Sequence, residues 1–512
     1  MMKKILTINL ILSMLLFPIC FSEDEPYFDK ELFIQLAKEE RTLKTGLIEC
    51  INHALKNNSE IKVRRLDTLI AYDDIKIAGS EFEPSLTVGY SLYDSEKESV
   101  SRSSSLGYPD IPTYRDINYD ASLSGKIVTG TEYTVSFLNK RYKSNSLLQK
   151  YNPYYLTNPS VSLTQPLLRD FGILVNRADI IIAKKNKKQS VEGFKAMVMD
   201  TVTGTKIAYF TYFYAQDGYS IADLSLARAK DLLDVNKARY EKGLISSVDL
   251  LETEAFVAGK EKTLLSAESI LKLAEDNLKI ITNYVDDPLY WNAKLELTDK
   301  PENIKKEVNL IDCLENAFSY RPDYEEAKID LESRDIKIKV AKNGLLPTLD
   351  ITGSFGLNSL GKNYNQAIDR LNTDYKDWSV GLEATLPWGG GDRANYDKVK
   401  LEKAKALIEF KRLEQNIILE IRDRVRAVDI QYRQLGAASL SKEKETQNYQ
   451  AQKERYDAGQ ISTHDMLEYQ NELTAAELEY TKALIDYNTA IINLDRSEGM
   501  TLMRNSILLE EQ

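Results

Sequence analysis

Proline and glycine, the residues that most often interrupt helices, are scarce in this sequence. It has 13 prolines and 23 glycines among 512 residues, where average usage would give about 26 and about 36. No proline lies between Pro166 and Pro288, and none follows Pro387. Two long stretches therefore lack a helix-stopping proline, and we expect long helices in both.

Histidine and cysteine are also few, with two histidines and three cysteines. Cys20 falls in the N-terminal leader, which leaves Cys50 and Cys313. These are too few for a disulfide framework or a Cys/His zinc site. No set of Ser, His and Asp suggests catalysis. We therefore expect no enzyme, no metal and no cofactor.

Runs of positive charge are missing as well. The formal net charge is −11, and no segment stands out as rich in Lys and Arg, which argues against nucleic acid as a partner. Hydrophobic residues at 43% and charged residues at 28% exclude both a disordered chain and a polytopic helical membrane protein.

Long apolar runs are confined to the N-terminus. Two lysines precede an apolar stretch over residues 5–17, and residues 20–22 form an acceptable cleavage site. This pattern predicts a secretory signal peptide over residues 1–22. Acylation of Cys20 is the alternative, although the residues before it make a poor lipobox. Since no later apolar run reaches 18 residues, any membrane crossing must use strands.

The rest of the chain is two copies of one unit. Residues 46–51 are similar to residues 309–314, and residues 239–252 are similar to residues 455–468. The first copy also carries an insertion between roughly residues 95 and 158. Each copy is expected to contain a short helix, a medium helix, strands, a long helix, a glycine turn and a return helix.

The expected boundaries follow from this repeat. The first repeat is predicted over residues 23–284, with strands at about 85–93, 117–138 and 159–166 and a helical hairpin over 173–284. The second repeat is predicted over residues 309–499, with strands at about 348–357 and 378–386 and a helical hairpin over 392–498. Residues 285–308 are expected to link the repeats, and residues 500–512 to form a C-terminal tail.

Both return helices carry apolar residues at every seventh position. Such a repeat predicts coiled-coil packing against a neighbouring helix. The two columns are Leu250, Val257, Leu264, Leu271 and Leu278, and then Met466, Leu473, Tyr480, Tyr487 and Leu494.

The strand segments alternate apolar and small polar residues, as in Leu86, Val88 and Tyr90 set between serine, threonine and glycine. This pattern suits a membrane barrel with lipid outside and water inside. A half-buried strand of a soluble sheet shows the same alternation. The secretion signal favours the barrel. Because four to six strands cannot close a barrel and an open edge is excluded in lipid, several chains must share one.

The insertion is expected to add a hairpin around the turn Thr129-Gly130. Tyrosines surround this segment, as they would in an aromatic belt at a membrane interface. A tyrosine-rich surface loop is the alternative, and the sequence leaves both open, so the chain has either four or six barrel strands.

Three motifs in this arrangement carry a resemblance to a known family. Strands end in Gln165-Pro166-Leu167-Leu168-Arg169-Asp170-Phe171-Gly172 and in Leu386-Pro387-Trp388-Gly389-Gly390-Gly391, and the helices turn at Arg-Tyr-x-x-Gly-x-x-Ser in both copies. With the signal peptide and the two repeats, this resembles the TolC family of outer membrane factors.

The resemblance implies a mainly α fold with a β-barrel part. Long coiled-coil hairpins would form an α-barrel in the periplasm, and the strands would contribute to a β-barrel shared by a homotrimer in the outer membrane. The extra hairpin departs from the family's usual four strands per chain, so the count is four or six, and six would give an 18-stranded barrel. Partners would be a periplasmic adaptor protein, an inner-membrane ABC or RND-type transporter and outer-membrane lipid.

The resemblance also assigns residues at the two turns. Asp465 and Glu468 match the family's acidic constriction at the periplasmic end of the channel. Residues expected at the tip or in contact with the adaptor are Arg239, Tyr240, Gly243, Ser246, Asp249, Glu252, Arg455, Tyr456, Gly459 and Ser462. Independently, Ser246 with Asp249 and Ser462 with Asp465 have the spacing of capping boxes.

The function predicted from these features is a passive exit duct for efflux or type I secretion, located in the outer membrane. The alternative is a secreted coiled-coil scaffold or adaptor that does not conduct. Alternating strands discriminate between the two, since a scaffold has no need for them. The cargo is not specified by the sequence.

Overall fold

A computed structural model describes residues 42–96, 111–286 and 288–508. The expected signal peptide and Cys20 lie outside these residues. The described chain divides into two compact units. The hairpin unit comprises residues 42–59, 201–305 and 429–492, and the sheet unit comprises residues 60–200, 306–428 and 493–508. None of the helices in the described ranges is long and apolar enough to cross a membrane.

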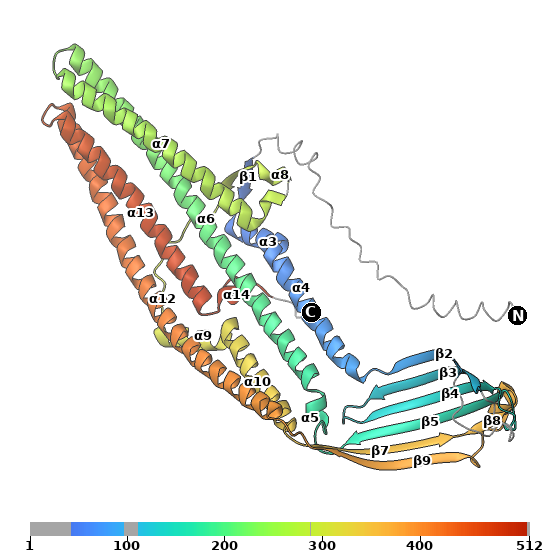
Figure 1. Ribbon diagram of the computed structural model, residues 1–512. Coiled ribbons are helices and arrows are strands. Elements are labelled where there is room, and N and C mark those ends of the chain that lie inside the picture. Colours follow the sequence, from blue (N-terminus) through green and yellow to red (C-terminus); the bar gives the residue numbers. More distant parts are fainter. Residues whose placement is uncertain (1–41, 97–110, 287, 509–512) are drawn as a thin grey trace. The chain divides into compact units, whose positions relative to one another are not determined.

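Long helices dominate the chain, as the lack of proline predicts. Helix α6 (Ala178–Glu241) and helix α12 (Gly391–Asp457) are followed by the return helices α7 (Ser247–Thr282) and α13 (Thr463–Ser497). In the hairpin unit, α7 runs back beside the last part of α6, and α13 beside the last part of α12 (Figure 1). Each pair is a helical hairpin closed by a short turn.

The hairpin unit also contains smaller elements from both sides of the repeat boundary. Strand β1 (Thr42–Thr45) pairs in parallel with β6 (Lys294–Leu297), and α3 (Leu47–Asn57) follows β1. The segment 285–308, expected to be a linker, thus holds β6 together with a 3-10 turn, η3 (Tyr284–Asp286), and a short helix, α8 (Pro288–Trp291). A strand of four residues leaves too little periodicity to be recognised in the sequence.

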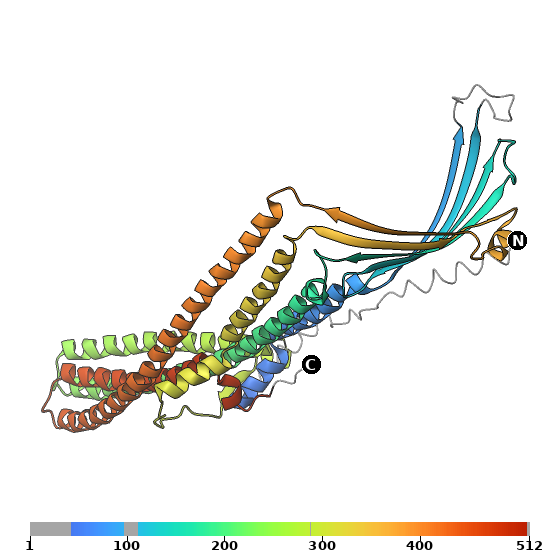
Figure 2. The same ribbon diagram turned by 90° about the horizontal axis from the view of Figure 1, so that it is seen from below.

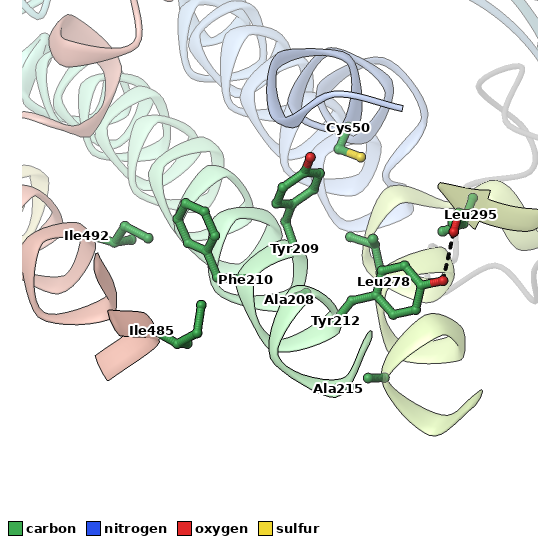
Figure 3. Packing of buried hydrophobic residues seen from close by; sticks show 11 residues of the cluster. Cys50, Ala208, Tyr209, Phe210, Tyr212, Ala215, Leu278, Leu295, Ile485 and Ile492 are labelled. Carbon is green, nitrogen blue, oxygen red and sulfur yellow. Dashed lines mark hydrogen bonds between the residues drawn. The ribbon is translucent and has the colours of Figure 1, made fainter. Parts of the chain in front are cut away.

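The main core of this unit gathers around the middle of α6 (Figure 3). Tyr209 and Tyr212 are fully buried there beside Leu278 and Leu295. Tyr212 donates its hydroxyl proton to the Leu295 carbonyl at 2.8 Å, so the small sheet is tied to α6. Truncating Leu278 to alanine would cost about 2–5 kcal/mol of stability, as large-to-small changes in a core do.

Cys50 lies in the same core, and its burial raises the pKa of the thiol to about 11. Cys313, in the sheet unit, is also buried, and burial raises the pKa of its thiol to about 12. Both thiols are free and stay protonated at neutral pH. They are packing residues, as expected from their apolar surroundings.

The seven-residue columns of the return helices face the interior of the structure. Val257, Leu278, Met466 and Leu473 are buried, and Leu264 is half-buried. Side chains at this spacing point to one side of a helix that packs along a neighbour. The positions that the heptad pattern predicts to pack against a neighbouring helix are thus the covered positions of the return helices.

The sheet unit is built around a curved antiparallel sheet (Figures 1 and 2). Helix α4 (Ser59–Gly79) and a 3-10 turn, η1 (Ser80–Phe82), lead into its first strand, and α9 (Leu310–Tyr320) and α10 (Pro322–Asn343) lead into its second-repeat part. Its long strands are β2 (Ser85–Glu96), β3 (Thr113–Lys126), β4 (Glu132–Ser144), β5 (Tyr154–Pro166), β7 (Thr348–Leu357) and β9 (Lys376–Thr385).

The strand order is β2-β3-β4-β5-β7-β9, with β8 (Ser359–Gly361) pairing with the outer end of β5. The described chain therefore has six long strands. The inserted hairpin, expected over 117–138, extends over 113–144 and separates β2 from β5. A short helix, α11 (Tyr364–Asp369), joins β8 to β9.

The two faces of this sheet differ in chemistry. One row of directly paired residues crosses all six strands with hydroxyl groups, and the adjacent row crosses them with apolar groups. The hydroxyl row is Ser85, Ser124, Thr134, Ser162, Ser354 and Ser379. The apolar row is Leu86, Leu123, Val135, Val161, Phe355 and Trp378. Every member of the apolar row is exposed in the single chain.

The architecture confirms a mainly α fold with a sheet part. The expected tail over 500–512 begins with a short helix, α14 (Thr501–Arg504). Of the two readings left open for the tyrosines around the insertion, the strands show one arrangement in detail: the rings of Tyr93, Tyr114, Tyr142 and Tyr154 form a row across four strands, with centroids 4.9–6.1 Å apart. These tyrosines share the face of the hydroxyl row, because they stand an even number of residues from its members. They do not form a belt on the apolar face.

Candidate functional site

The two glycine turns lie in the hairpin unit, and we call residues 239–252 the first tip and residues 455–468 the second tip. Gly243 has φ +70° and Gly459 has φ +73°. The Gly243 amide donates to the Tyr240 carbonyl at 2.8 Å, and the next amide donates to the Arg239 carbonyl at 2.9 Å. Gly459 repeats the same pair of bonds. Each helix thus ends in a Schellman motif, which favours glycine at this position.

Replacing Gly243 or Gly459 with proline should disrupt the turn. Proline fixes φ near −65° and has no amide proton, so the variant loses both the positive φ and one bond of the motif. We expect loss of export with the strand region still inserted in the membrane, measured by transport assays and by protease protection of the strands. Gly436→Ala, in the middle of α12 with open space around its Cα, is the control. Normal export by both proline variants would contradict the role of these turns.

Both return helices begin with the capping boxes that their sequences predict. Ser246 accepts from the Asp249 amide at 3.2 Å, and the Asp249 carboxylate accepts from the amide and hydroxyl of Ser246 at 3.0 and 2.7 Å. Ser462 and Asp465 repeat this arrangement at 3.2, 3.1 and 2.7 Å. These bonds hold the pKa of both aspartates below the usual value. Both carboxylates are therefore ionised at neutral pH, and each is hydrogen-bonded to the N-cap serine of its own helix.

The two glutamates of the tips differ from each other. The Glu252 carboxylate accepts a hydrogen bond from His464 Nδ1 at 2.7 Å, which joins α7 to α13 and raises the pKa of the imidazole. Glu468 is exposed, and the described residues give its carboxylate no hydrogen bond or ion pair. Of the predicted constriction pair, Asp465 thus caps its own helix, while the carboxylate of Glu468 is exposed.

A buried polar cluster joins the two hairpins near the tips. The Asn236 amide donates to Thr253 Oγ1 at 2.8 Å and its carbonyl accepts from the Tyr456 hydroxyl. The Tyr456 hydroxyl also lies 3.2 Å from Thr463 Oγ1. All four side chains are at most 4% exposed. Asn236 of α6 therefore joins α7 and α12, and Tyr456 extends the cluster to α13.

Two arginines of α6 strengthen this connection. Arg239 donates to the carbonyls of Tyr456 and Asp457 at 2.9 and 3.3 Å, and its guanidinium lies 4.3 Å from the centre of the Tyr456 ring. It thus places a positive charge at the C-terminus of α12, where the helix dipole favours one. Arg228 forms a bidentate pair with Glu477 at 3.1 and 2.9 Å, largely shielded from solvent.

The repeat counterparts of these residues behave differently. Arg455, the counterpart of Arg239, donates to Gln452 of its own helix at 3.1 Å. Tyr240, the counterpart of Tyr456, is exposed, whereas Tyr456 is buried. The sequence motif is shared by both tips, but only its arginine in the first copy and its tyrosine in the second reach the other hairpin.

Asn236, Arg228 and Glu477 were not among the predicted site residues. A signal for Asn236 exists in the sequence, because it ends a column with seven-residue spacing that otherwise holds alanines: Ala208, Ala215, Ala222 and Ala229. All five positions are buried. A single asparagine in such a column typically fixes helix register and partner at some cost in stability. Arg228 and Glu477 are separated by too much sequence for any pattern to pair them.

The described residues contain no group of His, Cys, Asp or Glu arranged to hold a metal ion. The tips offer hydrogen bonds, ion pairs and the field of their carboxylates. Such an arrangement can hold two hairpins together and act on ions that pass nearby.

Comparison with known proteins agrees with this architecture. The chain is 22% identical over 362 residues to nodulation protein T of Rhizobium leguminosarum bv. trifolii, covering 67% of this chain and 73% of that protein. It is 23% identical over 360 residues to outer membrane protein TolC of Escherichia coli (strain K12), covering 69% and 71%. Its fold is similar to the crystal structure of the Campylobacter jejuni CmeC outer membrane channel, with a TM-score of 0.64 and 20% identity over 89% of this chain and 86% of that one.

The family model described as outer membrane efflux protein matches residues 50–283 and 313–500, which include most of both repeats. The chain belongs to the outer membrane efflux protein family.

Proposed function

We propose that the chain is the outer-membrane exit duct of a tripartite efflux pump or a type I secretion system, and that it conducts its cargo passively. The observation that carries this proposal is the two-faced sheet, with a hydroxyl row on one side and an exposed apolar row on the other. An apolar face suits lipid and a face of hydroxyl groups suits a water-filled lumen. Family membership supports an outer-membrane location, with export by the signal peptide over residues 1–22.

The runner-up, a secreted scaffold that does not conduct, fits this sheet poorly. A row of six large apolar side chains exposed to water would favour aggregation. A scaffold would gain nothing from it, whereas a membrane wall requires it.

The duct is proposed to be a homotrimer. Strands β2 and β9 end the sheet of the described chain, and each presents unpaired backbone groups along one side. Such an edge is excluded in lipid, so it must pair with another chain. The strands of β2 and β9 run in opposite directions, which allows the β9 strand of one chain to pair antiparallel with β2 of the next.

The trimer is tested by extracting membranes in mild detergent and measuring the mass of the purified particle. We expect three chains per particle and no folded single chain in the membrane. The same particle placed in a planar bilayer should conduct. A monomer embedded in the membrane would contradict the shared barrel, and a trimer that never conducts would favour the scaffold.

The tips are proposed to form the periplasmic end of the duct. Around a threefold axis, Asp465 and Glu468 would repeat to give an acidic constriction. The first tip carries exposed apolar side chains at Leu244, Val248 and Leu251, which supports contact with a periplasmic adaptor there. An inner-membrane ABC or RND-type transporter would supply the energy.

A further inference from the structure

The inserted hairpin β3–β4 is the feature of this chain that the proposed duct does not by itself require. It lies between β2 and β5 and is paired on both sides without a break. β2 pairs with β3 from Ser85–Ser124 to Glu96–Thr113, and β4 pairs with β5 from Glu132–Thr164 to Tyr142–Tyr154. A hairpin that folded across a lumen or lay on a surface would leave β2 free to pair with β5.

The faces of the hairpin continue the faces of the strands around it. Leu123 and Val135 stand in the apolar row between Leu86 and Val161, and Ser124 and Thr134 stand in the hydroxyl row between Ser85 and Ser162. The stacked tyrosines likewise run from β2 through both inserted strands to β5. A plug surrounded by water would have no reason to keep an exposed apolar face in register with its neighbours.

The turn of the hairpin is fixed to the start of the helical region. The Gly172 amide donates to the Thr129 carbonyl at 3.2 Å, and Lys126 pairs with Glu81 of η1 at 2.6 Å. Gly130 has φ +95°, and a Cβ on it would overlap the Asp170 carbonyl oxygen. Contact this close shows that the turn is seated against the segment joining β5 to α6.

We infer that β3 and β4 are part of the membrane wall, so that each chain supplies six spanning strands and the trimer, which rests on the proposed function, closes as an 18-stranded barrel. Both inserted strands exceed the roughly 9–11 residues needed to cross a bilayer. The hairpin adds two strands, so β2 and β9 still run in opposite directions and the antiparallel order holds where chains meet.

The size of the exit follows from the strand count. With strands about 4.8 Å apart and tilted by about 40°, 18 strands give a backbone diameter of about 36 Å, against about 24 Å for 12 strands. After a layer of side chains about 5 Å deep on the inner face, the bore is about 26 Å against about 14 Å. The barrel therefore admits bulky hydrated cargo, and the narrowest part of the duct lies elsewhere.

The wall is tested by electron cryomicroscopy of the detergent-extracted trimer and of a variant that lacks residues 113–144. Excision leaves β2 and β5 antiparallel with matching apolar faces, so the variant is expected to close with 12 strands. We expect the intact barrel to be about 1.5 times as wide as that of the variant. A 12-stranded wall in the intact protein, with the hairpin inside or outside it, would overturn the inference.

A second measurement does not depend on the folding of the excised variant. Single cysteines replace Ser122 and Ser136 on the hydroxyl face and Leu123 and Val135 on the apolar face of the membrane-embedded trimer. A water-soluble maleimide should label the first pair at least tenfold faster than the second. Thr87→Cys on the hydroxyl face and Val88→Cys on the apolar face of β2 are the matched control pair. The unsubstituted chain measures the background labelling of Cys50 and Cys313.

The outcomes separate the two proposals. If the control pair alternates but the hairpin positions are labelled equally, the hairpin is outside the wall and the inference fails while the duct stands. If the control pair is labelled equally as well, and no channel forms in a bilayer, the proposed function itself fails.

Discussion

The Asn236→Ala variant should conduct several times more current than the unsubstituted protein in planar bilayers. Asn236 bonds directly to Thr253 of α7 and to Tyr456 of α12, and Tyr456 in turn contacts Thr463 of α13. Its removal deletes two buried hydrogen bonds, each worth about 0.5–1.5 kcal/mol. A change of one or two kcal/mol shifts an equilibrium by about 5- to 30-fold, here toward separated hairpins and a wider opening.

Gln452→Ala is the matched control for this prediction. Gln452 occupies the equivalent repeat position on α12, but it bonds only to Asn448 and Arg455 of its own helix. The control should therefore conduct like the unsubstituted protein. Equal conductance of the two variants would mean that the buried cluster does not hold the tips together.

The second large effect is expected on ion selectivity. Glu468→Ala together with Asp465→Ala should reduce the preference for cations and the block by divalent or trivalent cations. Even in bulk water a carboxylate attracts a cation at 4 Å by about 1 kcal/mol, and three chains would place several around one opening. Because Asp465 caps its helix while Glu468 is exposed, we expect Glu468→Ala alone to produce most of the change.

The control for selectivity is Asp249→Ala with Glu252→Ala at the first tip. Asp249 has the same capping bonds as Asp465, so loss of a cap is matched between the two double variants. Membrane insertion should be unaffected in both. If the two double variants change selectivity equally, or if neither does, the constriction is not at Glu468.

Much of the fold was predictable because it depends on local signals that occur twice. The turn glycines, the Ser-x-x-Asp caps and the heptad columns each act within one or two helical turns, and the structure places them as their spacing predicts. Family membership confirms the interpretation of these signals as an outer-membrane factor.

The contacts that join the hairpins were less predictable because they depend on tertiary packing. Arg239 and Arg455 stand in the same sequence motif, but only Arg239 bonds to the other hairpin. The residues around each arginine do not predict this difference. The sequence also did not show that Tyr93, Tyr114, Tyr142 and Tyr154 share the hydroxyl face, because that depends on the register of the strands. β1 and β6 were missed because each has four residues and their partner lies far away in the chain.

The position of the hairpin between β2 and β5 also bears on how such a wall can grow over evolutionary time. Insertion of a single strand would carry the following helix to the wrong side of the membrane, so the smallest tolerated addition is a pair. In a trimer, each pair of strands added to one chain is added to all three chains. The circumference of the barrel can therefore change only in steps of six strands. The exit width of such assemblies would therefore change in discrete jumps.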